Sequence, residues 1–373
     1  MFLKSIFAFI AGHIMAFFGG NTEIYVATET PKTAETTIST STETETKIDS
    51  KVDLATTTPT KVIKEENKST STPKKAVEKI VKQEEPQIIQ IPIPDFEKLN
   101  TSARNTVVNI LCTTKFNSMS PITGTGVIVS EDGVILTNAH VGQYFLLKDY
   151  AGKDSISCVA RTGSPAYPEY NIELIYISPT WVKDNSSMLK SQNPTGTGEN
   201  DFAFLKITGR IDGSALKDKF SYLQPNTREF INKNEPVLLV SYPAGFLGGI
   251  SVLKDLNISS SITNIQDYFT FKENTIDLIS VGGTVVSQKG SSGGAVVDIF
   301  SALLGIISTS SDGNTTDKRD LRAITLAHIN RSLQKELVID IFVFLKKNTE
   351  IAESFKKVTS PELTKILEDV IKS

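Results

Sequence analysis

The sequence predicts an all-β barrel protein with helices at its C-terminal end. Between residues 106 and 325, short runs rich in β-branched residues alternate with clusters of turn-forming residues, which is the pattern of an all-β sandwich or barrel. From Ala327 to Leu345 the apolar residues change to helical spacing. Residues 28–86 contain no aromatic side chain and are dominated by Thr, Glu, Lys and Ser, so the folded region begins only after them.

Each expected strand is an apolar run bounded by turn residues. A first group of strands is expected at Thr106–Thr113, Gly124–Ser130, Val134–Thr137, Ser155–Ala160, Ile172–Ile177 and Phe202–Ile207. A second group is expected at Pro236–Ser241, Gly249–Leu253, within Asn257–Ile265, and at Thr275–Val281, Thr284–Ser287, Ala295–Asp298, Leu303–Ser308 and Leu321–Thr325. Residues 161–199 are rich in Pro, Gly, Ser and Asn, and we expect surface loops there beside the strand at 172–177.

Two helices are expected after the last strand. The first spans Ala327–Leu345. The second begins at Ser360, with Pro361 in its first turn, a favourable start for a helix. We therefore expect a folded domain over residues 95–345 and a helical extension over residues 346–373.

The N-terminal region predicts export. One lysine, Lys4, precedes an apolar run within residues 1–27, as in a secretory signal; with Ile24, Tyr25 and Val26 the run approaches the length of a membrane span. A cleaved signal peptide and a retained signal anchor both remain open. Residues 28–94 form the expected disordered linker rich in Thr, Glu and Lys, and end in an extended arm at Gln87–Pro94. The protein is thus expected outside the cytoplasm, either secreted or anchored to a membrane.

Three stretches carry candidate chemistry. The first, Gly290-Ser-Ser-Gly-Gly-Ala-Val-Val297, takes a serine through a tight turn into a strand. The second, Ile135-Leu-Thr-Asn-Ala-His-Val141, places His140 at the end of a strand. The third, Asn200-Asp-Phe-Ala-Phe-Leu205, opens a strand with Asp201. A serine hydroxyl becomes a nucleophile only beside a base and a site for the oxyanion, and these stretches supply candidates for both.

The three stretches resemble the motifs of trypsin-like serine peptidases. Thr-Asn-Ala-His resembles that family's TAAH, Asp-Phe-Ala-Phe-Leu its DIALL, and Gly-Ser-Ser-Gly-Gly its GDSGG, and they occur in the family's order. The similarity is greatest to the Deg/HtrA branch. It implies two antiparallel six-stranded β-barrels of the chymotrypsin type with the active site between them, and serine endopeptidase activity on proteins or peptides. The PDZ domain of full-length Deg/HtrA proteins is not expected after Leu345.

The resemblance also implies roles for individual residues. It makes Ser292 the nucleophile, His140 the base and Asp201 its orienting acid, with the oxyanion hole formed by the N–H groups of Gly290 and Ser292. By register, Val286 lies at the floor of the primary specificity pocket, and Ser308, Thr309 and Ser310 form one wall. Because Val286 is not acidic, a small or medium apolar substrate side chain is favoured over Lys or Arg.

The resemblance bears on the cysteines as well. The chain has two, Cys112 and Cys158. Members of the family often carry a cysteine directly after the catalytic histidine, where this chain has Val141. Export permits a disulfide, but we expect two free, buried thiols.

Other classes of protein are less well supported. The net charge of -3 gives no reason to expect nucleic acid as a partner, and no cofactor or metal is expected. Gly124-Thr125-Gly126 lacks the rest of a nucleotide-binding motif. Ser292 followed by His328 also fits the G-x-S-x-G elbow of α/β-hydrolases, but that elbow leads into a helix and leaves His140 without a role. The alternative function is a catalytically inactive peptidase-fold module that binds a partner or peptide at the cell surface. The oligomeric state stays open.

Overall fold

The structure, a computed structural model, describes residues 94–115, 119–191, 197–245, 247–272, 274–310, 315 and 318–373. These residues belong to one compact unit, Ile91–Ser373. The predicted export segment (1–27) and residues 28–93 of the predicted linker lie outside the described residues. Within the described ranges, no helix has the length and apolar character needed to cross a membrane.

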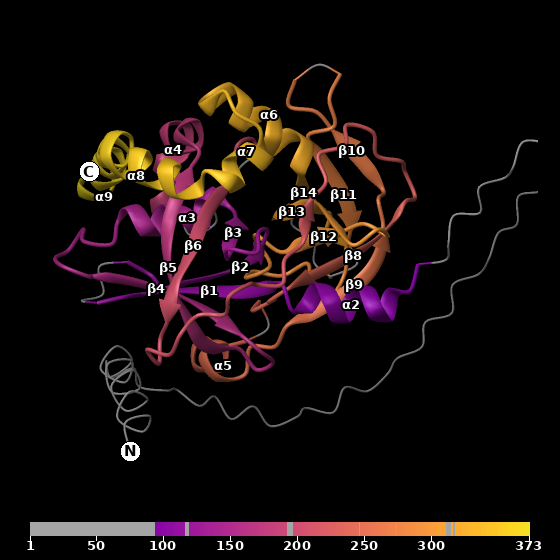
Figure 1. Cartoon of the computed structure of the whole chain (residues 1–373), viewed down its shortest axis with the longest axis horizontal. Helices are drawn as coiled ribbons and strands as arrows, with labels where there is room; N and C mark the ends of the chain where they lie inside the picture. Colours follow the sequence, from indigo (N-terminus) through magenta and orange to yellow (C-terminus); the bar gives the residue numbers. More distant parts are fainter. Residues whose placement is uncertain are drawn as a thin grey trace, which may run out of the picture. The chain divides into compact units, whose positions relative to one another are not determined.

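The first barrel is a closed antiparallel sheet, with its strands in the order β1-β2-β3-β6-β5-β4 (Figure 1). Its strands are β1 (Val107–Thr114), β2 (Ile122–Ile128), β3 (Val134–Thr137), β4 (Ile156–Thr162), β5 (Tyr167–Ile177) and β6 (Ala203–Arg210). All six were predicted, β3 with the same bounds. Every residue of β3 is buried, so this strand lacks the alternation of buried and exposed positions that is typical of a half-exposed strand.

A disulfide between Cys112 and Cys158 links β1 to β4. The two residues lie directly opposite each other in the β1–β4 register, so that their side chains leave the same face of the sheet at neighbouring positions. The expectation of two free thiols was therefore wrong. The missing cysteine after His140 excludes one bridge of the family, and it says nothing about a bridge elsewhere.

The second sheet is open and carries eight strands. Seven follow the order β10-β11-β14-β13-β12-β8-β9, and β7 pairs with β13 in parallel. Their bounds are β7 (Gln224–Pro225), β8 (Pro236–Ser241), β9 (Ser259–Asn264), β10 (Asp267–Phe269), β11 (Leu278–Gly282), β12 (Ala295–Val297), β13 (Ala302–Ser310) and β14 (Leu321–Thr325). The sheet curls towards closure, since the Thr263 hydroxyl on β9 donates to Val281 O on β11 at 3.0 Å. The fold is thus the predicted chymotrypsin-like double barrel, with a half-barrel in place of a second closed one.

Two predicted strands of this region are not strands. Gly249–Leu253 lies in the short helix α5 (Gly249–Lys254), whose Val252 and Leu253 carbonyls accept hydrogen bonds from the buried Arg161 guanidinium. This tertiary contact outweighs the β-propensity of the segment. Thr284–Ser287 is a turn in which the Thr284 N–H donates to the Ser287 hydroxyl, a local bond that competes with strand pairing.

Helices cap and connect the sheets. Their bounds are α2 (Phe96–Arg104), α3 (Ala139–Leu146), α4 (Pro179–Asn185), the 3₁₀ helix η1 (Ser186–Lys190), α6 (Leu326–Leu337), α7 (Ile341–Lys346), α8 (Asn348–Val358) and α9 (Ser360–Lys372). The loops expected over residues 161–199 were wrong in part, because α4 and η1 lie within them. The helix predicted over Ala327–Leu345 is divided into α6 and α7, since Val338 adopts a left-handed conformation with φ 61°.

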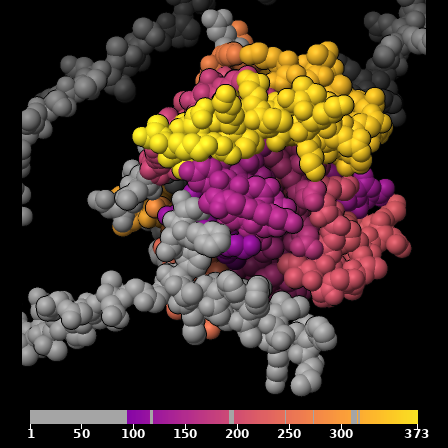
Figure 2. All heavy atoms as spheres, turned by 90° about the vertical axis from the view of Figure 1, so that its left-hand side faces the viewer, coloured from indigo at the N-terminus to yellow at the C-terminus, as the bar shows by residue number. Residues whose placement is uncertain are grey.

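The C-terminal helices cover the first barrel. Phe344 of α7 packs against Phe204 in a tilted arrangement with ring centroids 4.3 Å apart, and Phe355 of α8 meets Tyr176 edge-on at 5.4 Å. Figure 2 shows these helices (yellow) as a continuous layer over the magenta segments of the first half of the domain. Burial of these rings ties the C-terminal extension firmly to the first barrel.

Candidate active site

His140 and Asp201 leave the first barrel at the same edge. Strands β3 and β6 pair antiparallel with Thr137 opposite Ala203, so the residues just beyond Thr137 and just before Ala203 are neighbours. His140 lies in the first turn of α3. That helix sits tightly against β6, because a Cβ added to Gly142 would lie 2.5 Å from the Ala203 Cβ.

The Asp201 carboxylate binds His140 through both of its oxygens. Oδ2 lies 2.8 Å from His140 Nδ1, and Oδ1 accepts the His140 backbone N–H at 2.9 Å. The Asn138 amide donates to Asp201 O at 2.9 Å. The Asp201 side chain is 6% exposed and that of His140 31%, so the acid is enclosed while the imidazole reaches the surface.

The charges of the pair support each other. Burial by itself would lower the pKa of His140, but the negative charge and hydrogen bond of Asp201 outweigh it and raise this pKa above its ordinary value of 6.5. Burial would raise the pKa of Asp201, but the charge of His140 and the hydrogen bonds from its ring, its backbone and Ser308 hold it below its ordinary value. The aspartate therefore stays ionised and fixes the ring with its Nδ1 proton towards the carboxylate.

Ser292 lies on the glycine-rich turn that precedes β12. The turn is docked against the first barrel, since the Thr125 N–H donates to Ser292 O at 2.8 Å. Gly290 and Gly293 have φ values of 93° and 84°, which other residues rarely adopt. A Cβ on Gly293 would lie 2.0 Å from Thr125 O. Glycine at this position is what allows the serine loop to approach the first barrel.

The two adjacent serines have different environments. Ser291 is 1% exposed, and its hydroxyl accepts a hydrogen bond from Ser241 at 2.9 Å. Ser292 is half-buried, and its hydroxyl has no hydrogen-bond partner among the residues that the structure describes. This difference makes Ser292 the accessible hydroxyl of the pair.

The structure brings Ser292 to the edge that carries His140. At Gly124, an added Cβ would lie 2.8 Å from Val141 Cγ2 and 3.6 Å from Ser292 O, so Gly124 is flanked by the serine and by the residue next to His140. Within the described ranges no hydrogen bond joins the Ser292 hydroxyl to the His140 ring. Such catalytic hydrogen bonds are often long before substrate binds.

The residues predicted to form the specificity pocket are distributed differently. Val286 is fully buried in the apolar cluster of the second sheet. The Ser308 hydroxyl donates to Asp201 Oδ2 at 2.9 Å, so it supports the acid, a role that sequence reasoning did not assign. Thr309 and Ser310 lie in β13, but their side chains are outside the described part of the structure. A strand position alone could not have indicated which way the Ser308 hydroxyl points.

His328 belongs to a separate buried cluster. It lies at the start of α6, as predicted, with its N–H capped by the Thr325 hydroxyl at 3.1 Å. Its Nδ1 lies 3.2 Å from Asp277 Oδ1. Because Ser292 leads into strand β12 and not into a helix, the α/β-hydrolase elbow is excluded. In the described ranges, no group of three or more His, Cys, Asp or Glu residues could hold a metal ion.

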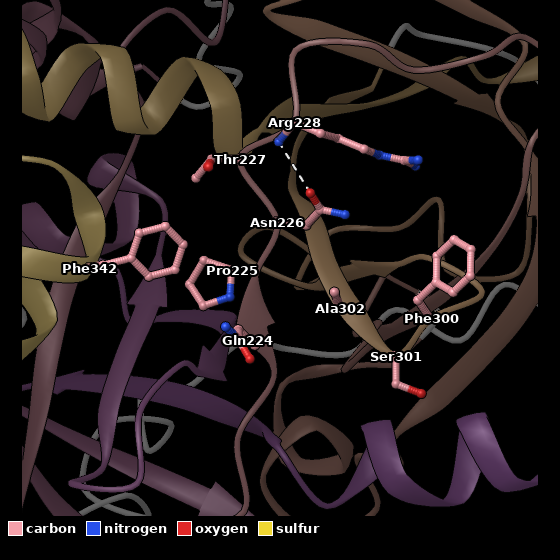
Figure 3. A pocket seen from close by; sticks show the side chains of 9 residues that line it. All are labelled: Gln224, Pro225, Asn226, Thr227, Arg228, Phe300, Ser301, Ala302 and Phe342. Carbon is pink, nitrogen blue, oxygen red and sulfur yellow. Dashed lines mark hydrogen bonds between the residues drawn. The ribbon is translucent and has the colours of Figure 1, made fainter.

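A pocket of about 430 Å³ lies beside β7 and the start of β13 (Figure 3). Phe342 of α7 faces Pro225 of β7 on one side, and Phe300, at the turn before β13, lies on the other. None of the predicted site residues lines this pocket. The pocket is therefore not part of the site that contains His140 and Asp201.

Comparison with family models identifies a peptidase-type domain in this chain. Residues 124–306 match the model of the trypsin-like peptidase domain, a range that contains His140, Asp201 and Ser292. Among solved structures, the Rv3671c protease of M. tuberculosis in its active form matches with 16% identity and a TM-score of 0.40, covering 65% of this chain and 88% of that one. A search of curated proteins finds no match. The family match and the fold together support a trypsin-like peptidase.

Proposed function

We propose that the chain is a serine endopeptidase that hydrolyses peptide bonds through a Ser292–His140–Asp201 triad. The observation that carries this proposal is the pair of hydrogen bonds that the enclosed Asp201 carboxylate accepts from the His140 ring and the His140 backbone N–H, at 2.8 and 2.9 Å. That bond leaves His140 Nε2 free of a proton and able to accept one. The motif resemblance supports a Deg/HtrA-like branch as part of this proposal.

Each residue of the triad has one task. The Ser292 hydroxyl attacks the substrate carbonyl while His140 Nε2 takes its proton, and the imidazolium then gives this proton to the leaving amine. Asp201 holds the tautomer and stabilises the imidazolium. Water, activated by the same imidazole, then hydrolyses the acyl-enzyme and restores the Ser292 hydroxyl.

The backbone around Gly290 supports an oxyanion hole. The Ala244 N–H donates to Lys289 O at 2.7 Å. Because the C=O and N–H groups of a trans peptide point in opposite directions, the Gly290 N–H, which belongs to the same peptide as Lys289 O, points away from Ala244. Neither the Gly290 nor the Ser292 N–H donates to any acceptor among the described residues. Both donors are therefore available to the negative oxygen that develops during attack.

Labelling with a fluorophosphonate tests the nucleophile directly. The wild-type protein and Ser291→Ala should both take the label, because the Ser291 hydroxyl is buried and hydrogen-bonded to Ser241. Ser292→Ala should not take it. Labelling of Ser292→Ala together with loss of label in Ser291→Ala would contradict the register. An unlabelled, folded wild-type protein would favour the inactive binding module.

The primary specificity proposed here is for a small or medium apolar side chain. It is supported by Val286, whose family register is the pocket floor and whose neighbours in the second sheet are apolar. Cleavage of a peptide library, read by mass spectrometry, tests it. Cleavage mainly after Lys or Arg would overturn this assignment and leave the triad untouched.

We also propose that the protein works outside the cytoplasm. The apolar run in residues 1–27 supports this, and so does the Cys112–Cys158 disulfide, since such bonds persist in oxidising compartments. Full-length protein that resists carbonate extraction from membranes would support an anchor, and a soluble form starting near Thr28 would support secretion. Soluble cytoplasmic protein with Met1 intact would contradict both.

A further inference from the structure

Thr125 of β2 binds the region around Ser292 through its hydroxyl and its backbone N–H. It is fully buried. Its hydroxyl donates to Gly290 O at 2.7 Å and accepts the Tyr242 N–H at 3.1 Å. Its backbone N–H donates to Ser292 O at 2.8 Å, and its carbonyl accepts the Thr137 hydroxyl at 2.7 Å. One residue of the first barrel thus binds two loops of the second half of the domain.

These bonds fix both peptides that flank Gly290. The peptide after Gly290 is held by the Thr125 hydroxyl on Gly290 O. The peptide before it is held by Ala244, whose N–H donates to Lys289 O at 2.7 Å. Tyr242, two residues before Ala244, is bound by the same Thr125 hydroxyl. The hydroxyl therefore acts on one flanking peptide directly and on the other through the loop of residues 242–244.

The space around Gly290 leaves that peptide few alternatives. A Cβ added there would lie 2.8 Å from Tyr242 O and 2.9 Å from the Ala244 Cβ, so the two loops are in close contact. Because Lys289 O and Gly290 O both accept hydrogen bonds, neither peptide beside Gly290 can rotate without breaking a buried hydrogen bond, which is costly. An oxyanion hole depends on such fixed donors, because donors that must reorient during attack stabilise the transition state less.

We propose that the Thr125 hydroxyl is a positioning group for the oxyanion hole, holding the Gly290 N–H in place to bind the transition-state oxygen. This inference rests on the proposed peptidase function. Thr125 does not touch the reacting atoms, and it acts through the orientation of the Gly290 peptide.

Thr125→Val removes the hydroxyl and keeps the shape of the side chain, while Thr125→Ser keeps the hydroxyl. Removal of an oxyanion donor costs roughly 100- to 1,000-fold in kcat, so misplacing one should cost about 10- to 100-fold. We expect that loss for Thr125→Val in kcat for p-nitrophenyl acetate and in the rate of fluorophosphonate inactivation. KM and the midpoint of the pH–rate profile should stay near wild type, because the His140–Asp201 pair is unchanged, and Thr125→Ser should recover most of the rate.

Thr106→Val is the matched control. Thr106, directly before β1, is also buried, and its hydroxyl donates to a backbone carbonyl, Ala103 O of α2, at 2.7 Å. Thermal unfolding should show comparable losses of stability in the two valine variants, with loss of kcat only in Thr125→Val. Near-wild-type kcat in Thr125→Val, an equal loss in Thr106→Val, or no recovery in Thr125→Ser would each overturn the inference. Wild-type protein that takes no fluorophosphonate label would instead overturn the proposed function, and the inference with it.

Discussion

Asp201→Asn is the substitution whose effect the structure defines most sharply. The amide has the shape of the carboxylate but only one acceptor oxygen. Asp201 Oδ1 accepts the His140 backbone N–H, a donor that cannot change its role. The asparagine oxygen must therefore occupy that place, and its NH₂ group then faces His140 Nδ1, where Oδ2 now lies at 2.8 Å.

The consequence is the wrong tautomer of His140. An NH₂ group at this position donates to Nδ1, so the ring proton moves to Nε2. Nε2 can then no longer take the proton of Ser292. Ser308, whose hydroxyl now donates to Oδ2, can rotate to accept from the amide, so the fold should survive. A histidine held in the wrong tautomer lowers kcat about 10⁴-fold, which corresponds to about 5 kcal/mol of transition-state stabilisation.

The rate of fluorophosphonate inactivation at neutral pH measures this effect. Asp298→Asn is a suitable control, because Asp298 is fully buried and accepts backbone N–H groups from Phe300 and Ala302 but contacts no histidine among the described residues. It should lower the thermal midpoint and leave the rate of the folded protein near wild type. If Asp201→Asn retains more than about one-tenth of the wild-type rate, the tautomer argument is wrong.

Three further predictions follow from the same contacts. Because Asp201 raises the pKa of His140 above 6.5, inactivation should speed up as pH rises through a midpoint above that value; a flat profile between about pH 5 and 9 would contradict this. Gly293→Ala should abolish labelling, since its Cβ would meet a β2 carbonyl at 2.0 Å, whereas Gly248→Ala, with open space around it, should not. Replacing Cys112 and Cys158 by alanine opens a loop with a sequence separation of 46, and urea unfolding should show about 4 kcal/mol less stability.

The barrel strands could be predicted where each one is an apolar run with clear turns on both sides. β3 and β14 have the predicted bounds, Val134–Thr137 and Leu321–Thr325. The errors occur where a distant residue decides the local structure. Nothing within Gly249–Leu253 indicates that Arg161, on another strand, binds the carbonyls at the end of this segment. The residues of this segment alone therefore could not predict the hydrogen bonds from Arg161.

The same division holds for the candidate site. His140, Asp201 and Ser292 could be named because each lies in a short motif, and the structure places the first two in direct contact. The supporting hydroxyls could not be named. The Ser241–Ser291 bond and the Ser308–Asp201 bond depend on how strands far apart in sequence are aligned, and the disulfide depends on the β1–β4 register in the same way.

The two halves of the domain support each other's functional groups through single buried hydroxyls. Ser308, on β13, donates to Asp201 at the edge of the first barrel. Thr125, on β2 of the first barrel, donates to Gly290 in the serine loop. Glu336 of α6, which follows β14, accepts the hydroxyls of Tyr176 and Ser178 from the first barrel, both at 2.7 Å. Because a hydroxyl without its partner in a dry interface is costly, the packing of the two halves and the assembly of the site favour each other. The base and acid of the proposed site both lie on the first half and contact each other there, whereas Ser292 and Gly290 lie on the second half, so the proposed site is complete only when the two halves are packed together.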